Sequence, residues 1–457
     1  MPGALSTRIF YFILCLGLGL ATWMIFHNLG NGSLDLWDES LTAGRSLYVY
    51  QHDSILNLKV NGELSIRKPP LMYMLNAASF KVFGVNLFSL RLANALFGFA
   101  CFVLLAWLTY RVLGLRYAAA SPWLLLGSYH IFSISREALT DTIFVTSFLL
   151  AAISMTYLFS KDRSPLFPRL LFGLAVLLVL CGKGLVGFFL IGYSLAFLFL
   201  FSRDEFTKYL YVSTIFSLPF VLWLAVQWIQ NDQMTTVIEQ EYIERMSYDS
   251  QFLPDHIKGP DWYLRRLWKE NRLTGVLGLF GFISVIWVWL SRRTSKPNVI
   301  SLPVLYIAGL CACYFILISF VVAHKQSRYI MPMIPLLVPI VLFWLKMLWE
   351  KPRALPRRTA TALLFLCIVS GAYATADHYR RTPDYQPLAR KMADTIHDEV
   401  VNRKLQPYTD TTPHAMLLHF YLQRQVLVKA AGELPPGSVY VAPPKKAGQP
   451  FVVKVVE

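Results

Sequence analysis

The sequence predicts an all-α polytopic membrane protein with a small α/β segment at its C-terminal end. The 457 residues are 55% hydrophobic and only 15% charged, whereas a soluble domain carries about 25% charged residues. The mean hydropathy of +0.47 points the same way. The apolar residues also fall in runs near the length that crosses about 30 Å of hydrocarbon. Together these observations favour about eleven transmembrane helices within residues 1–376.

Each apolar run is expected to form one span. The first run is kept as a helix because it is longer than the core of a signal peptide and no small-residue cleavage site follows it. Two of the runs are short and meet at Gly182-Lys183-Gly184. The expected spans are residues 9–27, 87–108, 118–134, 141–159, 169–181, 184–201, 209–229, 274–290, 299–322, 330–347 and 359–376.

The short loops carry most of the net charge of +16, and the positive-inside rule makes loops rich in Lys and Arg cytoplasmic. This distribution accounts for the basic excess without a nucleic-acid partner. Under strict alternation of the spans, the cytoplasmic side holds Arg111, Arg116, Lys161, Arg163, Arg169, Arg203, Lys208, Arg292, Arg293, Lys296, Lys351, Arg353, Arg357 and Arg358. The N-terminus is then cytoplasmic and the C-terminus periplasmic, and the short loops favour a bacterial inner membrane.

The opposite, outer face holds the long loops 29–86 and 230–273 and the tail 377–457. The tail is too polar to span a membrane, so we expect a small extracytoplasmic domain there. Pro383–Lys404 has the pattern of an amphipathic helix. Short runs with the pattern of strands occupy Val426–Lys429, Ser438–Val441 and Phe451–Val455.

The first outer loop places two adjacent acids, Asp38 and Glu39, directly after the first span. Acids at a membrane surface are costly unless they are solvated or paired. Lys68 follows in the same loop, and its ammonium group suits a phosphate. The alternative is that all three are ordinary solvated charges. Arg91 weighs against that alternative, because a cation early in the second span must pair with an acid or extend to the interface.

Other ionisable residues lie at the ends of later spans. Lys183 stands between glycines and apolar helices and needs a partner, which a phosphate head group or Asp141 could supply. Arg136 and Asp141 could also pair with each other. The remaining candidates on the outer face are Arg245, His256, Lys325, Arg328 and Tyr329. A transporter is expected to place such groups at mid-membrane, so their position at helix ends favours a lipid-phosphate substrate with a polar group to transfer.

The order of several motifs resembles the GT-C membrane glycosyltransferases. These motifs are Trp37-Asp38-Glu39, Lys68-Pro69-Pro70, Arg91-Leu92, Gly182-Lys183-Gly184 and Arg328-Tyr329-Ile330-Met331-Pro332. Over residues 9–345 the chain is similar to the branch of dolichyl-phosphate-mannose protein mannosyltransferases and bacterial aminoarabinose (lipid A) transferases. The resemblance implies the GT-C fold and an inverting transferase. Such an enzyme moves a hexose or pentose from a polyprenyl-phosphate sugar to a lipid or glycan acceptor of the cell envelope, on the outer face.

The resemblance also implies roles for individual residues. Asp38 corresponds to the general base that activates the acceptor, with Glu39 as a helper or ion contact and Asp141 as a second functional acid. The residues that match positions for the donor phosphate are Lys68, Arg245 and Tyr329. Lys183 and Arg328 are added because a buried cation needs a partner. The further candidates are Arg136, His256 and Lys325.

Two departures from the aminoarabinose branch concern a metal. That branch tends to have an acid immediately before the Lys-Pro and a His in a Glu-His-Ile stretch, where this chain has Arg67 and Tyr242. Both positions look like metal ligands in that branch, so no metal site of that kind is expected, and aminoarabinose and lipid A are disfavoured as substrates. No cofactor is required. A divalent ion held by Glu39, Asp141 and His256 stays open, although a lone loop histidine is more often simply solvated.

Two alternative functions stay open. A protein O-mannosyltransferase would use a similar donor with a Ser or Thr acceptor. A polytopic lipid or solute transporter is the alternative from another class, and it would need ionisable groups or broken helices at mid-span.

Overall fold

The computed structural model describes residues 2–35, 37–160, 166–250, 254–291, 302–350, 354–380, 387–429, 434–442 and 452–456. Most of these residues are helical, and the strands form two small sheets. The chain divides into two compact units. Unit 1 comprises Met1–His27, Leu96–Ser135 and Thr140–Arg381, and unit 2 comprises Asn28–Ala95, Arg136–Leu139 and Thr382–Glu457.

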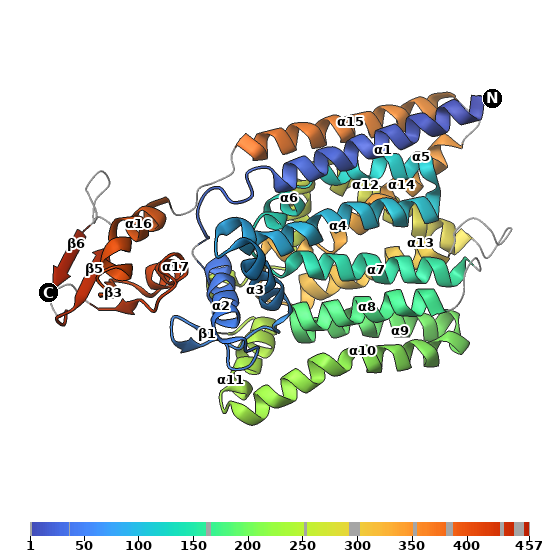
Figure 1. Ribbon diagram of the computed structural model, residues 1–457. Helices are drawn as coiled ribbons and strands as arrows, with labels where there is room; N and C mark the ends of the chain where they lie inside the picture. Colours follow the sequence, from blue (N-terminus) through green and yellow to red (C-terminus); the bar gives the residue numbers. More distant parts are fainter. Residues whose placement is uncertain are drawn as a thin grey trace. The chain divides into compact units, whose positions relative to one another are not determined.

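Unit 1 is a bundle of apolar helices (Figure 1). Its helices are α1 (Pro2–Phe26), the later turns of α4 (Leu87–Leu113), α5 (Leu115–Leu126), α6 (Tyr129–Ser135), α7 (Asp141–Phe159), α8 (Leu166–Lys183), α9 (Phe188–Phe201), α10 (Arg203–Gln230), α11 (Met234–Ile238), α12 (Trp262–Ser291), α13 (Leu302–Ile316), α14 (Met333–Trp349) and α15 (Ala354–Arg380). Every span expected from the sequence has helix at its place. Among the described residues, six helical segments are long and apolar enough to cross a membrane. The predicted polytopic membrane protein is confirmed.

Two of the expected spans are interrupted. Residues 118–134 form two helices rather than one, because α5 ends with Gly127 as its C-cap and α6 begins at Tyr129. Residues 184–201 begin as a 3-10 turn at Gly184–Gly187. Gly184 has a φ of +77° there, which glycine adopts without steric cost. Of the predicted cytoplasmic cations, those that lie outside the described residues are Lys161, Arg163, Arg292, Arg293, Lys296, Lys351 and Arg353.

Small residues let neighbouring helices of unit 1 pack closely. A Cβ on Gly17 of α1 would lie 2.8 Å from the indole nitrogen of Trp123 in α5. That nitrogen donates a hydrogen bond to the carbonyl of Ile13 over 3.1 Å. Gly173 of α8 leaves room in the same way for the ring of Phe216 in α10. Close approach at small residues is usual where helices associate in membranes, and Figure 1 shows α7, α8 and α10 running side by side.

The first outer loop is folded within unit 2. It contains α2 (Asp38–His52), strands β1 (Lys59–Val60) and β2 (Glu63–Leu64), which pair antiparallel, and α3 (Leu71–Phe83). These elements share a buried core with the start of α4, the turn at residues 136–139 and α17 (Thr412–Leu422). The core residues are Leu34, Ala43, Phe80, Leu87, Leu90, Ala138, Leu417 and Phe420.

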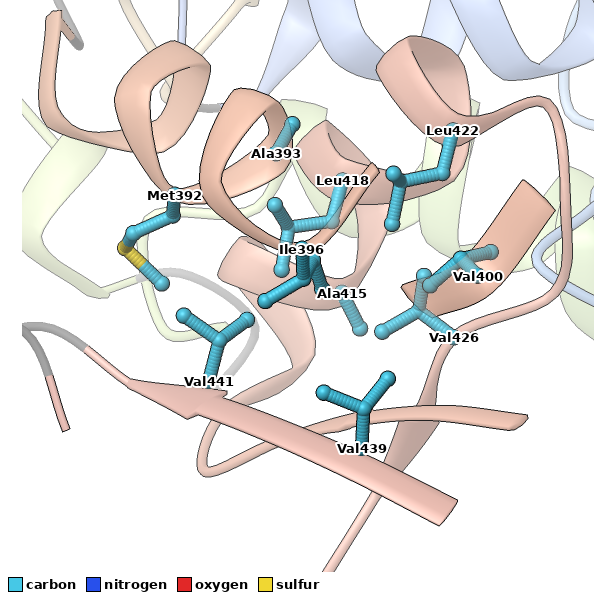
Figure 2. Close-up of a cluster of buried hydrophobic side chains, with 10 residues drawn as sticks. All are labelled: Met392, Ala393, Ile396, Val400, Ala415, Leu418, Leu422, Val426, Val439 and Val441. Atoms are coloured by element: carbon cyan, nitrogen blue, oxygen red, sulfur yellow. The ribbon is translucent and has the colours of Figure 1, made fainter. Parts of the chain in front are cut away.

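The C-terminal part of unit 2 is a small α/β layer, as predicted. Beside α17 it contains α16 (Pro387–Val401) and the strands β3 (Gln406–Thr409), β4 (Leu427–Val428), β5 (Ser438–Ala442) and β6 (Val452–Val456). The sheet order is β4-β3-β5-β6, in which β3 is parallel to both neighbours and β6 is antiparallel to β5. Figure 2 shows the apolar face of α16 (Met392, Ala393, Ile396 and Val400) against α17 and the sheet.

The sequence predicted α16 and three of these strands, and the structure adds β3 and α17. Phe451, the first residue of the last predicted strand, lies outside the described residues. Inside unit 2 the tail contacts the first loop. The side chain of Asn61 donates to the carbonyl of Val426 over 2.6 Å and accepts from its amide over 2.7 Å. The division into domains 1–376 and 377–457 stays a prediction.

Candidate functional site

Asp38 and Lys68 lie together in unit 2. Asp38 is the first residue of α2, where the positive end of the helix dipole stabilises a negative side chain. The Nζ atom of Lys68 is 3.9 Å from Oδ1 of Asp38. The side chains are 35% exposed for Asp38 and 28% exposed for Lys68. The pair therefore combines a carboxylate and an ammonium group that solvent or a substrate can reach.

Polar contacts of Arg45 join the helix that begins at Asp38 to the segment that carries Lys68. Arg45 of α2 donates from Nη2 to the hydroxyl of Ser65 over 2.7 Å and from Nη1 to the hydroxyl of Tyr73 over 2.9 Å. Arg45 thus ties α2 to both ends of the segment that carries Lys68. Sequence reasoning did not select Arg45 or Tyr73. The sequence carried no signal for either residue, because the segment of α2 is mostly polar and its burial arises only in the folded chain.

Glu39 is surrounded differently from Asp38, although the two are adjacent. Its side chain is 0% exposed and pairs with Arg91, whose Nε lies 2.7 Å from Oε1. Arg91 also donates from Nη2 to Oε2 over 3.0 Å. The amides of Asp35 and Ala138 complete the set, each donating to the carboxylate over 2.9 Å. Glu39 is the acid partner that the sequence required for Arg91.

Arg91 in turn holds the chain segment that leads to Asp38. Its guanidinium donates to the carbonyls of Leu29 (3.2 Å), Asn31 (2.9 Å) and Ser33 (2.9 Å). Because charge-assisted hydrogen bonds are among the stronger ones, the Glu39–Arg91 pair fixes the entry to α2. Arg136, another predicted site residue, is also in unit 2 and donates to the carbonyl of Asn28 over 3.3 Å.

In unit 1, Lys183 and Arg328 share one acid. Nζ of Lys183 lies 2.6 Å from Oδ1 of Asp141, and Nε of Arg328 lies 4.0 Å from Oδ2. The three side chains are 15% exposed or less. Of the partners considered for Lys183 from the sequence, Asp141 is the one that the structure shows.

Arg245 and Tyr329 form a second contact in unit 1. Arg245 donates to the Tyr329 hydroxyl over 2.9 Å and pairs with Glu241 over 3.1 Å. Burial raises the pKa of Tyr329, against the opposing effect of Arg245 and Arg328, so the phenol stays protonated and can donate. Glu241 was not selected from the sequence as a partner.

These unit 1 residues form one electrostatic group, because Arg245, Arg328, Asp141 and Glu241 all act on Tyr329. With Lys183, the group contains three cations and two acids. The excess of positive charge suits an anion such as a phosphate.

Lys325 and His256 contact backbone groups of the protein itself. Lys325 is 2% exposed, and its ammonium group donates to the carbonyls of Ile318, Ser319 and Val322 over 2.7–3.0 Å. Burial lowers the pKa of Lys325 to about 8. Lys325 thus binds the carbonyl end of the π-helical turn Leu317–Val321, which continues α13. Burial and the charge of Arg245 lower the pKa of His256, whose carbonyl accepts from the amide of Lys325 over 2.9 Å.

Arg67 and Tyr242 stand at the two positions that look like metal ligands in the aminoarabinose branch. Among the residues that the structure describes, no three His, Cys, Asp or Glu side chains are placed to hold a metal ion together. Arg67 is exposed, and burial raises the pKa of Tyr242 to about 12, which leaves it a neutral phenol. Whether a divalent ion is needed stays a prediction.

A family model and one curated relative match parts of this chain. Residues 14–235 match the family model described as dolichyl-phosphate-mannose-protein mannosyltransferase. An uncharacterized protein from Aquifex aeolicus (strain VF5) is 26% identical over 318 residues, which are 68% of this chain but only 60% of that protein. The match therefore spans less than two thirds of that relative's length.

Two solved structures share the fold. ArnT from Cupriavidus metallidurans, bound to undecaprenyl phosphate, superposes with a TM-score of 0.70 at 18% identity, covering 91% of this chain and 86% of ArnT. The archaeal oligosaccharyltransferase AglB from Archaeoglobus fulgidus, in complex with an inhibitory peptide and a dolichol-phosphate, gives a TM-score of 0.63 at 12% identity, covering 92% of this chain and 64% of AglB. The predicted GT-C fold is confirmed, and so is the resemblance to this group of glycosyltransferases.

Proposed function

We propose that this integral membrane protein of GT-C fold is an inverting glycosyltransferase. It transfers a sugar from a polyprenyl-phosphate donor to a lipid or glycan acceptor of the cell envelope, on the outer face of the membrane. The family match over residues 14–235 supports the reaction class. The undecaprenyl phosphate of ArnT and the dolichol-phosphate of AglB support the donor class. A bacterial inner membrane with a cytoplasmic N-terminus is part of this proposal.

The contrast between Asp38 and Glu39 is the observation that carries the proposal. A general base must be an ionised group within hydrogen-bond reach of the acceptor. Glu39 is closed to solvent and already accepts four hydrogen bonds. Asp38 is 35% exposed at a helix N-terminus, so we assign the base to Asp38 and a positioning role to Glu39.

The step balances without a strong general acid. The acceptor hydroxyl oxygen forms a bond to the anomeric carbon on the face opposite the phosphate, and its proton goes to Asp38. The bond between the anomeric carbon and the phosphate oxygen breaks, and the electron pair leaves with the polyprenyl phosphate. Attack from the opposite face inverts the anomeric centre.

Cations stabilise the charge that develops on a phosphate leaving group. In unit 2 we assign this role to Lys68. Unit 1 offers a separate candidate group for a lipid phosphate, in which Arg245, Lys183 and Arg328 supply positive charge and the Tyr329 hydroxyl is a neutral donor. The positive excess of the unit 1 group supports this assignment. Asp141 holds Lys183 and Arg328 in place in this scheme.

A second candidate differs only in the acceptor. The family model over residues 14–235 is described by protein mannosyl transfer, which favours a Ser or Thr side chain as the nucleophile and mannose as the sugar. Asp38 would accept the proton from either kind of hydroxyl. Acceptor identity therefore decides between a glycolipid or glycan transferase and a protein O-mannosyltransferase.

A reconstitution experiment tests the proposal. The purified chain is placed in liposomes with a radiolabelled polyprenyl-phosphate sugar, and envelope lipids, glycans or unfolded envelope proteins are offered as acceptors. We expect label to move to one acceptor class, with release of polyprenyl phosphate and an inverted anomeric centre by NMR. Movement of intact donor across the bilayer without bond cleavage would instead establish the transporter alternative.

A further inference from the structure

Unit 2 contains a cavity of about 340 Å³ that neither Asp38 nor Lys68 lines. Its wall comes from the turn at residues 30–31, the entry to α4 at residues 85–88, and helices α16 and α17. Sites for small molecules generally span about 300–1,000 Å³. The cavity is therefore large enough for a compact ligand of one or a few rings.

The part of the wall formed by residues 30–31 and 85–88 is held by several contacts. A Cβ on Gly30 would lie 3.1 Å from the Cβ of Phe88, so only glycine fits there without displacement. Asn86 caps α4, since its Oδ1 accepts from the amide of Ser89 over 3.0 Å and its own amide donates to the Ser89 hydroxyl over 3.1 Å. Arg91 binds the carbonyl of Asn31 over 2.9 Å. Rigid walls lower the entropic cost of binding a ligand.

Helix α16 contributes planar polar side chains to the lining of the cavity. Three exposed residues of α16 line the cavity: Arg390, Asp394 and His397. Because they are four and three residues apart, they lie on one face of the helix. Among the described residues, neither Arg390 nor Asp394 makes a hydrogen bond or ion pair with another side chain. Their opposite charges leave the cavity close to neutral, which favours a ligand rich in hydroxyl groups over a phosphate.

Aromatic residues complete the cavity. Phe88, Phe420 and Tyr421 line it, and Phe88 is 36% exposed. The face of an aromatic ring carries partial negative charge, so it packs well against the C–H bonds on one face of a sugar ring. The Tyr421 hydroxyl accepts from the amide of Leu34 over 3.2 Å, which fixes the ring to the segment that leads to Asp38.

We infer that this cavity is a saccharide-binding site that takes a neutral sugar of the acceptor, away from the hydroxyl that reacts. Asp394, Arg390 and the amide groups of Asn31 and Gln423 bind hydroxyls, and Phe88 and Tyr421 pack against the ring. The inference rests on the proposed function in naming the sugar as part of the acceptor. The chain segment that forms one wall also leads into Asp38, so an occupied cavity would place the acceptor relative to the base.

Ligand-detected NMR tests the site directly. The full chain in phosphatidylethanolamine–phosphatidylglycerol nanodiscs, free of glycoside detergents, is mixed with methyl glycosides of glucose, galactose, mannose, N-acetylglucosamine and rhamnose. We expect saturation transfer to at least one of them. Asp394→Asn and Arg390→Ala should each raise its Kd about tenfold or more, the effect of losing a hydrogen bond to a charged group. The matched controls on the same helix, Asp398→Asn and Lys391→Ala, should leave the Kd unchanged, because neither residue lines the cavity.

The outcomes separate this inference from the proposed function. If no glycoside gives a signal that Asp394→Asn reduces, the saccharide site is refuted. It is equally refuted if inorganic phosphate, titrated in place of the sugars, binds in a manner that needs Arg390. Asp38→Asn should lower kcat for transfer by about 10²–10⁴-fold and retain sugar binding. Transfer by Asp38→Asn with sugar binding intact would remove the base and leave the cavity assignment standing.

Discussion

Glu39 and Arg91 form an ion pair almost closed to solvent, with side chains 0% and 7% exposed. Breaking a buried pair by neutralising one partner leaves the other charge uncompensated and costs about 3–5 kcal/mol. We therefore expect Glu39→Gln to lower the thermal unfolding midpoint of the solubilised protein strongly. Asp38→Asn, one residue away, should leave the midpoint near that of the wild type.

The double variant Glu39→Gln/Arg91→Met is the control for that prediction. Removing both charges should recover part of the loss, because coupled partners are not additive. An unfolding midpoint for Glu39→Gln equal to that of the wild type would show that the pair does not hold the entry to α2.

Lys68 offers a second test at the level of single residues. Its ammonium group is 28% exposed beside Asp38, and we assign it to the donor phosphate. Lys68→Ala should raise the Kd for the polyprenyl-phosphate donor about tenfold or more, with little change in the KM for the acceptor. Lys81→Ala is a matched control, because Lys81 is an exposed lysine of α3 paired with Asp53. Equal weakening of donor and acceptor would contradict the assignment.

At the level of secondary structure, Lys325 stabilises the turn that follows α13. Its ammonium group donates to three carbonyls at the end of that turn. The adjacent amides of Ala323 and His324 both donate to the carbonyl of Arg245, over 3.0 and 3.1 Å. Lys325 thereby holds the segment that positions Arg245, which explains its burial without a direct contact to substrate.

Lys325→Met should loosen that segment. We expect hydrogen exchange of residues 244–250 and 254–258 to quicken about tenfold or more, since each lost bond involves a charged donor, while α7 stays protected. Lys258→Met, at an exposed lysine of the same segment, should exchange like the wild type. Unchanged protection of residues 244–250 and 254–258 in Lys325→Met would show that Lys325 does not order them.

The sequence predicted some helices and missed others. Long apolar runs predicted the helices of unit 1, because membrane thickness fixes their length. α2 was missed because its sequence is mostly polar, and its burial comes from tertiary contacts such as those of Arg45 and Ser46. The break after α5 was missed because Gly127 and Ser128 lie inside an otherwise apolar run.

For the whole molecule, the sequence predicted which buried cations need an acid partner, but it did not predict how the first loop folds. The rule that a cation in a membrane span needs a partner led to Arg91 and Lys183, and the structure gives each an acid. The rule could not choose between Glu39 and other acids, because that choice depends on how the first loop folds in unit 2. Nor could it predict that Asn61 and Leu34 of that loop would bind the tail.

The central claim, that Asp38 is the base, has a direct measurement. Transfer from a polyprenyl-phosphate sugar is followed in liposomes for Asp38→Asn beside Glu63→Gln, an exposed acid of the same unit. We expect Asp38→Asn to lower kcat by about 10²–10⁴-fold, the usual contribution of a general base. It should retain donor binding and wild-type stability, and Glu63→Gln should transfer like the wild type. Wild-type turnover by Asp38→Asn would contradict the account.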